Sequence, residues 1–282
     1  MKTLSVALTA PVALSWCSIS GEAFPSRAGG CNVDAGPVRP LQGELGVERR
    51  DFIRALSAGL LSAVGPRPPR VLRIGTVGAM SEETRNGLAF GFSESARSAA
   101  LLGWRLSVVP MAGAPGRSDV SGVIAGRTKR ALPRDLAVVG VTCDAPGQSL
   151  FIPPCDAPLH APARGEGLHV TAWHHTLERY GAAQLNDRFH SATHTHMTGD
   201  AWVGWFAAKV LTESVLRTGS TDRAALSSYL RDTATVFDGH KGVGLRFDAR
   251  GRLRQPLYLL RRRPGSIEWE LDHEIPLAGQ AS

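Results

Sequence analysis

The chain has 282 residues, a length that accommodates one large domain or two small lobes. Its hydrophobic fraction of 43% and charged fraction of 20% are typical of a soluble globular protein. No apolar run reaches the length of about 18 residues that predicts a transmembrane helix. The formal net charge is +7, but the basic residues are scattered apart from Arg261-Arg262-Arg263, so no nucleic-acid partner is expected.

Residues 1–65 predict an export signal region. An apolar run at 4–14 follows Lys2 and precedes small residues, as in a secretory signal. At 48–65, paired arginines precede a phenylalanine and a short apolar run, a pattern that resembles a twin-arginine signal. Two signals in one chain favour a misassigned start, in which case residues 1–46 are not translated.

Proline-rich residues 66–70 predict an extended linker, and the folded domain is expected over 71–282. Hydrophobic patterning and a Ser-Glu-Glu helix start at Ser81 predict a strand at 71–77, a helix over 82–102 and a strand at 104–109. This order is the beginning of a parallel α/β layer.

The rest of the domain alternates short strands with helices. Strands are predicted at 120–125 and 136–141, followed by a long proline-rich loop at 143–167. Beyond the loop, the pattern predicts a strand at 168–173, helices at 174–189, 198–217 and from Ser220 or Thr221 to 232, a hairpin of 245–247 with 253–260, and a strand at 266–271.

The four cysteines, Cys17, Cys31, Cys143 and Cys155, match no zinc-ligand spacing. If the N-terminal region is removed, only Cys143 and Cys155 remain. In an oxidising compartment these two can pair, and as buried residues they can equally stay as free thiols. The sequence leaves both alternatives open.

The histidines are the strongest sign of a different function. His190, His194 and His196 fall within seven residues, with His174 and His175 nearby, and histidine is a common zinc ligand. No cysteine, aspartate or glutamate stands inside this cluster, so a metal site is kept as the alternative. No Gly-x-Ser-x-Gly motif, facing carboxylate pair or dinucleotide fingerprint is present, so no catalytic residue and no cofactor is predicted.

Four motifs carry a resemblance to a known family: Gly87-Leu-Ala-Phe-Gly-Phe-Ser-Glu94, Trp202-Val-Gly-Trp205, Phe237-Asp-Gly-His-Lys-Gly242 and Leu253-Arg-Gln-Pro-Leu-Tyr-Leu259. In this order they resemble type I periplasmic binding proteins of the branched-chain amino-acid class, which feed ABC transporters. They are particularly similar to the substrate-binding proteins encoded with pyrroloquinoline-quinone-dependent alcohol oxidation systems. The resemblance covers about residues 71–110 and 155–262.

This resemblance implies an α/β, type I periplasmic-binding-protein-like fold, with lobes of parallel sheet flanked by helices and a ligand cleft between them. It implies an exported, soluble, periplasmic monomer that binds a small-molecule solute without chemistry and passes it to an ABC transporter membrane permease. Relatives are longer, and the missing part falls at 143–167. The second lobe is therefore expected to be reduced, and a degenerate, non-binding paralogue is a further alternative.

The position of a ligand follows from the expected fold, because ligands of open α/β sheets bind beyond the carboxyl ends of the strands. The candidate ligand-binding residues are those that follow predicted strands: Met80, Ser81, Thr142, Asp144, Trp173 and His174. Hydroxyl groups can orient a carboxylate or an alcohol, and an indole can stack on an apolar ligand.

Overall fold

The computed structural model describes residues 69–111, 120–157, 167–263 and 265–277. The chain divides into two compact units, Met1–Gly65 and Pro66–Ser282, and all described residues belong to the second. The export signals predicted within residues 1–65, and most of the predicted linker, lie outside the described residues. No helix of the described part has the length and apolar character needed to cross a membrane.

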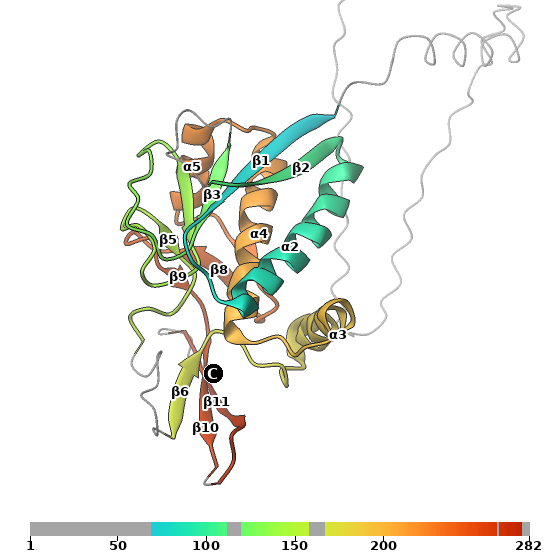
Figure 1. Cartoon of the computed structure of the whole chain (residues 1–282), viewed down its shortest axis with the longest axis vertical. Coiled ribbons are helices and arrows are strands. Elements are labelled where there is room, and N and C mark those ends of the chain that lie inside the picture. Colours follow the sequence, from blue (N-terminus) through green and yellow to red (C-terminus); the bar gives the residue numbers. More distant parts are fainter. Residues whose placement is uncertain (1–68, 112–119, 158–166, 264, 278–282) are drawn as a thin grey trace, which may run out of the picture. The chain divides into compact units, whose positions relative to one another are not determined.

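A five-stranded parallel sheet forms the centre of the second unit (Figure 1). Its strand order is β2-β1-β3-β4-β5, and the strands are β1 (Arg70–Val77), β2 (Trp104–Pro110), β3 (Gly122–Ala125), β4 (Ala137–Gly140) and β5 (Leu150–Phe151). All of the pairs are parallel. Helix α2 (Glu82–Leu101) makes the crossover from β1 to β2, so the predicted strand–helix–strand order is confirmed.

Helices cover one face of this sheet, and connecting segments cover the other. Ile124 and Val139 face a core shared with α2, α4 (Gly199–Thr218) and α5 (Arg223–Arg231). Their neighbours Val123 and Val138 face a smaller cluster with Leu132 and other residues of the connections. The two middle strands, β3 and β4, are therefore buried along their whole length, which explains their continuous apolar sequence.

Helices α2 and α4 lie side by side because glycines let their backbones touch (Figure 1). A Cβ atom added at Gly87 would collide with the carbonyl of Ala201, and one added at Gly204 would collide with the carbonyl of Thr84. The Ser81 hydroxyl accepts a hydrogen bond from the Thr84 N–H at 3.1 Å and caps α2, as the sequence predicts.

The predicted helix at 174–189 is wrong in its first part. Residues 174–178 are not helical and contain a turn at 175–176, a short 3₁₀ helix η1 spans Arg179–Gly181, and α3 begins only at Ala182 and ends at Thr193. The cause is the side chain of Asn186, whose Nδ2 donates to the carbonyls of His175 (2.8 Å) and Leu177 (3.1 Å). These bonds hold the segment as a loop and cannot be seen in helical periodicity.

Two three-stranded antiparallel sheets complete the unit, and they divide the predicted hairpin of 245–260. One contains β7 (Phe237–Asp238), β8 (Gly244–Phe247) and β9 (Leu253–Arg254); the other contains β6 (Leu168–Thr171), β10 (Leu257–Arg262) and β11 (Trp269–Ile275). The break falls at Gln255-Pro256, where Gln255 Nε2 donates to the Ile152 carbonyl at 2.7 Å. The last strand is β11, so the predicted strand at 266–271 begins three residues too early. The cap of α5 is Asp222 and not Ser220 or Thr221.

Cys143 and Cys155 form a disulfide, with their Cα atoms 5.4 Å apart. The structure thereby decides between the paired and the free thiols. The bond fixes the segment that follows β4 against the segment that follows β5, both within the region predicted as a long loop.

Candidate functional site

A pocket of about 850 Å³ lies between the β6-β10-β11 sheet and the start of α4. Its walls combine apolar side chains, imidazoles, threonine hydroxyls and two carboxylates: Trp173, Met197, Leu260, Ile267, Trp269 and Leu271; His169, His174, His175 and His196; Thr171, Thr176 and Thr198; Glu268 and Glu270. Gly199 completes the wall. The volume and the mixture are those of small-molecule sites.

The sequence builds this pocket from four separate segments, of which β10 contributes Leu260. Strand β6 delivers Thr171 and continues into Trp173 and His174. Thr198 caps α4 by accepting a hydrogen bond from the Ala201 N–H at 3.2 Å, which fixes the loop that carries the wall residues before the helix. Strand β11, in the same sheet as β6, supplies Trp269, whose ring centre lies 5.5 Å from that of His169.

Four histidine rings stand in a row beside the pocket, and we call them the histidine row: His174, His175, His196 and His190. Their ring centres are 4.4 Å apart for His174 and His175, 4.3 Å for His175 and His196, and 5.3 Å for His196 and His190. His174 anchors one end, through contacts of Nδ1 with the Thr176 hydroxyl (2.8 Å) and of Nε2 with the Trp269 carbonyl (3.3 Å).

Burial keeps two members of the histidine row, His174 and His175, neutral near neutral pH. It is the main cause that lowers the pKa of His174 below the ordinary value of 6.5, and the neighbouring His175 lowers it further. The pKa of His175 is lowered by burial and by His196, against an opposing effect of Glu268. His174 and His175 are therefore uncharged, adjoining rings that become charged only on acidification.

The structure does not assemble the predicted metal alternative of His190, His194 and His196. Within the described part of the chain, no group of three or more histidine, cysteine, aspartate or glutamate residues is placed to hold a metal ion. His190 and His196 stack with an angle of 18° between their planes. A metal needs nitrogen lone pairs that lie in the ring planes to converge on one point, and stacked rings turn them aside. His194 ends α3 in the left-handed conformation (φ 58°).

Of the six predicted ligand-binding residues, the structure brings Trp173 and His174 together in the 850 Å³ pocket. Trp173 is also part of the core, because its ring stacks on Trp202 at 5.9 Å and its Nε1 donates to Asn186 Oδ1 at 2.8 Å. Met80 lines a different pocket of about 510 Å³ at the carboxyl end of β1.

The other three predicted residues line neither of these two pockets. Ser81 caps α2 and donates to Asp200 Oδ2 at 3.1 Å. Thr142 and Asp144 follow β4; Asp144 is exposed, and the Thr142 hydroxyl oxygen is buried with no hydrogen-bond partner among the described residues. The rule that ligands bind beyond the carboxyl ends of strands therefore identifies two residues of the 850 Å³ pocket, and the other four predicted residues lie elsewhere.

Sequence reasoning missed the pocket residues Met197, Trp269 and Leu271. They come from the loop before α4 and from β11, which lies almost 100 residues beyond β6 in the chain. The one available signal was the alternation of Trp269 and Leu271 with charged residues, which is typical of a half-buried strand.

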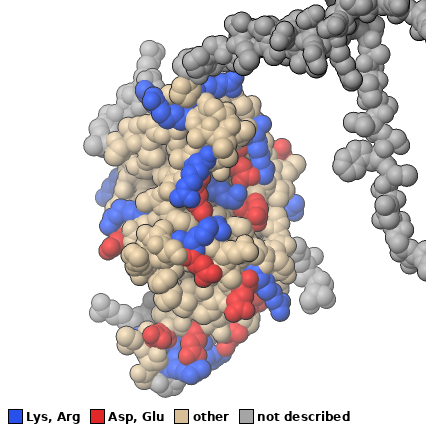
Figure 2. Space-filling model, turned by 90° about the vertical axis from the view of Figure 1, so that its right-hand side faces the viewer, with Lys and Arg blue, Asp and Glu red and all other residues tan. Residues whose placement is uncertain are grey.

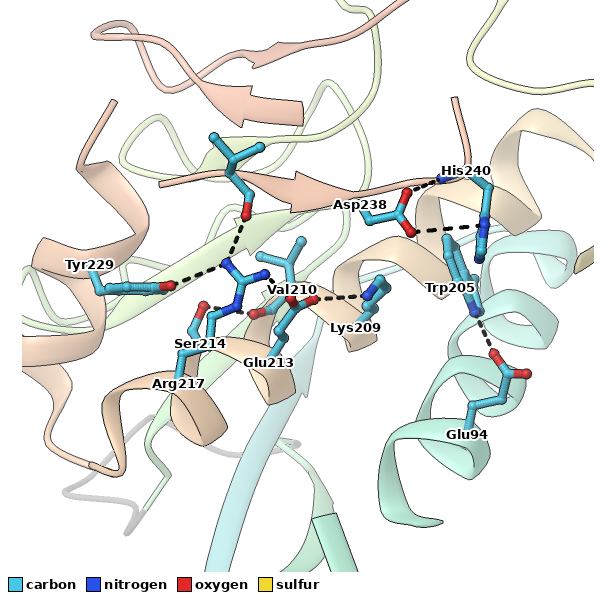
Figure 3. Close-up of polar contacts among 11 residues, drawn as sticks. Glu94, Trp205, Lys209, Val210, Glu213, Ser214, Arg217, Tyr229, Asp238 and His240 are labelled. Carbon is cyan, nitrogen blue, oxygen red and sulfur yellow. Dashed lines mark hydrogen bonds and ion pairs between the residues drawn. The ribbon is translucent and has the colours of Figure 1, made fainter. Parts of the chain in front are cut away.

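A second, polar groove of about 330 Å³ lies against α2 and α4 (Figure 3). Trp205 Nε1 and Arg188 Nε donate to the two oxygens of Glu94, at 2.9 and 2.8 Å. Lys209 and Arg217 both pair with Glu213. Acidic and basic side chains are also intermingled over the face shown in Figure 2. Because these carboxylates are paired within the chain, we assign no ligand to this groove.

Comparison with solved structures identifies the fold. LivJ of Streptococcus pneumoniae, the branched-chain amino-acid transporter substrate-binding protein solved with isoleucine, matches with a TM-score of 0.51 and 8% identity over 74% of this chain and 99% of LivJ. A possible leucine/isoleucine/valine-binding protein from Rhodopirellula baltica matches with a TM-score of 0.50 and 11% identity over 74% and 98%. The fold is that of the type I periplasmic binding proteins.

A branched-chain amino-acid ABC transporter ligand-binding protein from Burkholderia xenovorans has 15% identity and a TM-score of 0.34, over 80% of this chain and 62% of its own. No protein-family model and no curated protein matches the chain. At these identities the likeness establishes the fold alone, so the function must be argued from the site.

Proposed function

We propose that this chain is the exported solute-binding component of an ABC importer and that it captures a small organic solute in the 850 Å³ pocket. The observation that carries the proposal is the pocket itself: apolar rings line it, hydroxyl groups stand at its edge, and its volume suits a small molecule. The solved proteins of this fold with which the chain compares are a branched-chain amino-acid transporter substrate-binding protein and a possible leucine/isoleucine/valine-binding protein.

In this proposal the apolar walls exclude water, and polar groups orient the solute. Trp269 supplies a large apolar surface, Trp173 backs the wall from the core, and the hydroxyls of Thr171 and Thr176 offer hydrogen bonds. His174 offers a polar edge that is already oriented by Thr176 and the Trp269 carbonyl. Met80, Ser81, Thr142 and Asp144 are proposed as a second set of contacts at the carboxyl ends of the strands.

Transport then follows from a shift in population. A solute that binds better to one arrangement of the pocket walls shifts the protein toward that arrangement, which the membrane permease recognises. We further propose a periplasmic location, a monomeric state and a link to quinoprotein alcohol metabolism. The motif at 237–242 supports the link to quinoprotein metabolism, and the export-like segments at 4–14 and 48–65 support the location.

A thermal-shift screen of the purified chain tests the proposal. The solutes are short-chain alcohols, the corresponding acids, branched-chain amino acids, aromatic alcohols and zinc. We expect one organic solute to raise the melting temperature saturably, because a ligand present at 100 times its dissociation constant stabilises the folded state by about 2.7 kcal/mol.

A matched pair of variants locates the effect. Leu271→Trp places a larger side chain in the pocket wall and should abolish the shift, whereas Leu101→Trp changes a residue that is 88% exposed at the end of α2 and should leave it intact. A cooperative melt that no solute changes would favour the degenerate paralogue. A shift with zinc alone that is lost in the His194→Ala/His196→Ala double variant would favour the metal-binding alternative.

A further inference from the structure

The pocket is unusually rich in aromatic rings. Of its sixteen lining residues, six carry one: His169, Trp173, His174, His175, His196 and Trp269. The rings come from β6, from the segment after it, from the loop before α4 and from β11. The ring centres of His169 and Trp269 are 5.5 Å apart, and those of His174, His175 and His196 follow at 4.4 and 4.3 Å, so the rings form an extended aromatic lining. A planar aromatic solute gains edge and face contacts with such walls beyond the gain from buried area alone.

The charges that face the pocket do not favour an anion. No lysine or arginine is among the lining residues, whereas Glu268 and Glu270 are. Glu270 is paired with Arg263, whose Nε lies 2.8 Å from Oε2. Arg262 lies nearby, with its guanidinium 5.6 Å from the centre of the Trp269 ring, and it is not part of the wall.

Two further features could hold an anion, and neither is free to do so at neutral pH. Burial lowers the pKa of His174 and His175, so these imidazoles are uncharged there. The start of α4, where a helix dipole favours negative charge, already carries Asp200 in its first turn. A carboxylate that entered the pocket would lose water without gaining a cationic partner in the wall.

We propose, resting on the proposed function, that the pocket selects a planar aromatic solute that carries no carboxylate, of the aromatic alcohol or aromatic amine class. The aromatic ring lies against Trp269 and the partly exposed imidazole of His175, and the polar end faces the hydroxyls of Thr171 and Thr176 or the carboxylate of Glu268. This class differs from the amino acids, whose carboxylate requires compensation inside the site.

Four probes that share one framework separate ring, charge and shape. Benzyl alcohol, benzylamine and benzoate differ only in the polar end, and cyclohexylmethanol keeps the alcohol while losing the aromatic ring. Their dissociation constants for the full chain are measured by calorimetry at pH 7.5, beside leucine and isobutanol. We expect benzyl alcohol or benzylamine to bind at least about tenfold more tightly than benzoate, and threefold to tenfold more tightly than the cyclohexyl compound.

The outcomes separate this inference from the proposed function. Tightest binding of benzoate, or equal binding of cyclohexylmethanol and benzyl alcohol, overturns the aromatic selectivity while a working pocket remains. Binding of leucine or isobutanol with no binding of the benzyl compounds also overturns the aromatic selectivity. If no solute of any kind binds, the proposed function fails as well.

Two variants assign the selectivity to named side chains. Trp269→Leu removes one aromatic ring from the pocket wall. It should weaken the binding of benzyl alcohol by about threefold to tenfold and change the binding of cyclohexylmethanol less. Glu268→Gln should weaken the binding of benzylamine and leave the binding of benzyl alcohol unchanged. Glu83→Gln, on the exposed surface of α2, is the matched control. An equal effect of Glu268→Gln on the binding of both probes would exclude a role of this carboxylate in recognising the positive charge of benzylamine.

Discussion

The ammonium nitrogen of Lys241 lies 4.1 Å from the centre of the Trp202 ring, inside the core. The lysine is 2% exposed, and its Nζ donates to Gln255 Oε1 at 2.7 Å and to the Pro256 carbonyl at 3.0 Å. Burial lowers its pKa well below the ordinary value of 10.5, and Glu274 opposes this shift. Lys241 therefore ties the segment between β7 and β8 to the break between β9 and β10.

Replacing this lysine should cost stability. Lys241→Met keeps most of the side-chain volume but leaves two buried acceptors without a donor, so we expect the free energy of unfolding to fall by about 1–3 kcal/mol. Lys209→Met, which breaks only a half-exposed i,i+4 pair with Glu213, should cost about 0.5 kcal/mol or less. Urea denaturation of both variants gives the comparison. Equal losses would show that the buried contacts of Lys241 contribute little.

Stability should fall on acidification below pH 6.5. The folded protein holds the pKa of His174 and His175 below the ordinary value of 6.5. Between 6.5 and the lower pKa of each group in the folded protein, the unfolded chain binds more protons, so it is favoured as the pH falls. Melting temperatures at pH 7.5, 6.5 and 5.5 measure the effect, which His175→Gln should reduce. Asp272 is excluded as the cause, because its pKa is lowered from 3.8 and it acts only at lower pH. A flat profile in this range would contradict the lowered pKa of His174 and His175.

The disulfide should contribute substantially to stability. The Cys143→Ser/Cys155→Ser double variant is expected to lose about 2–4 kcal/mol, because the bond closes a loop with a sequence separation of 12. Chemical denaturation measures the loss, and a reducing agent should bring the native chain to the level of the double variant. Mass spectrometry of a non-reduced digest should show the two cysteine peptides joined. Separate peptides with free thiols would rule out the pairing.

Alanine at Gly87 should destabilise the protein although alanine is the better helix former. The added methyl group meets the Ala201 carbonyl of α4, and such overpacking costs about 1–3 kcal/mol beyond the gain of about 1 kcal/mol in helix propensity. Gly147→Ala is the matched control, because a Cβ atom there meets nothing within 4 Å. Thermal unfolding compares the two. A stabilised Gly87→Ala variant would mean that α2 and α4 are further apart than described.

Local signals in the sequence predicted several elements of the fold closely. Ser81 starts α2, and the turn that follows α2 ends in Gly103 with a φ of 74°, as a glycine after a helix predicts. The predicted start of α3 was wrong because the carboxamide of Asn186 donates hydrogen bonds to backbone carbonyls of the preceding loop. Trp173 and His174 were predicted for the site because they follow a strand, and they do line the pocket.

The sequence by itself determined the elements whose cause is local: the strand–helix–strand opening, the cap of α2 and the α/β class. Caps, periodicity and turn residues act over a few positions and can be recognised in one stretch of chain. Only the tertiary structure decided that Cys143 pairs with Cys155, that Lys241 is buried on Trp202, and that Trp269 and His174, 95 residues apart, line one pocket and touch through the Trp269 carbonyl. These contacts join distant segments, and packing of the whole core selects them.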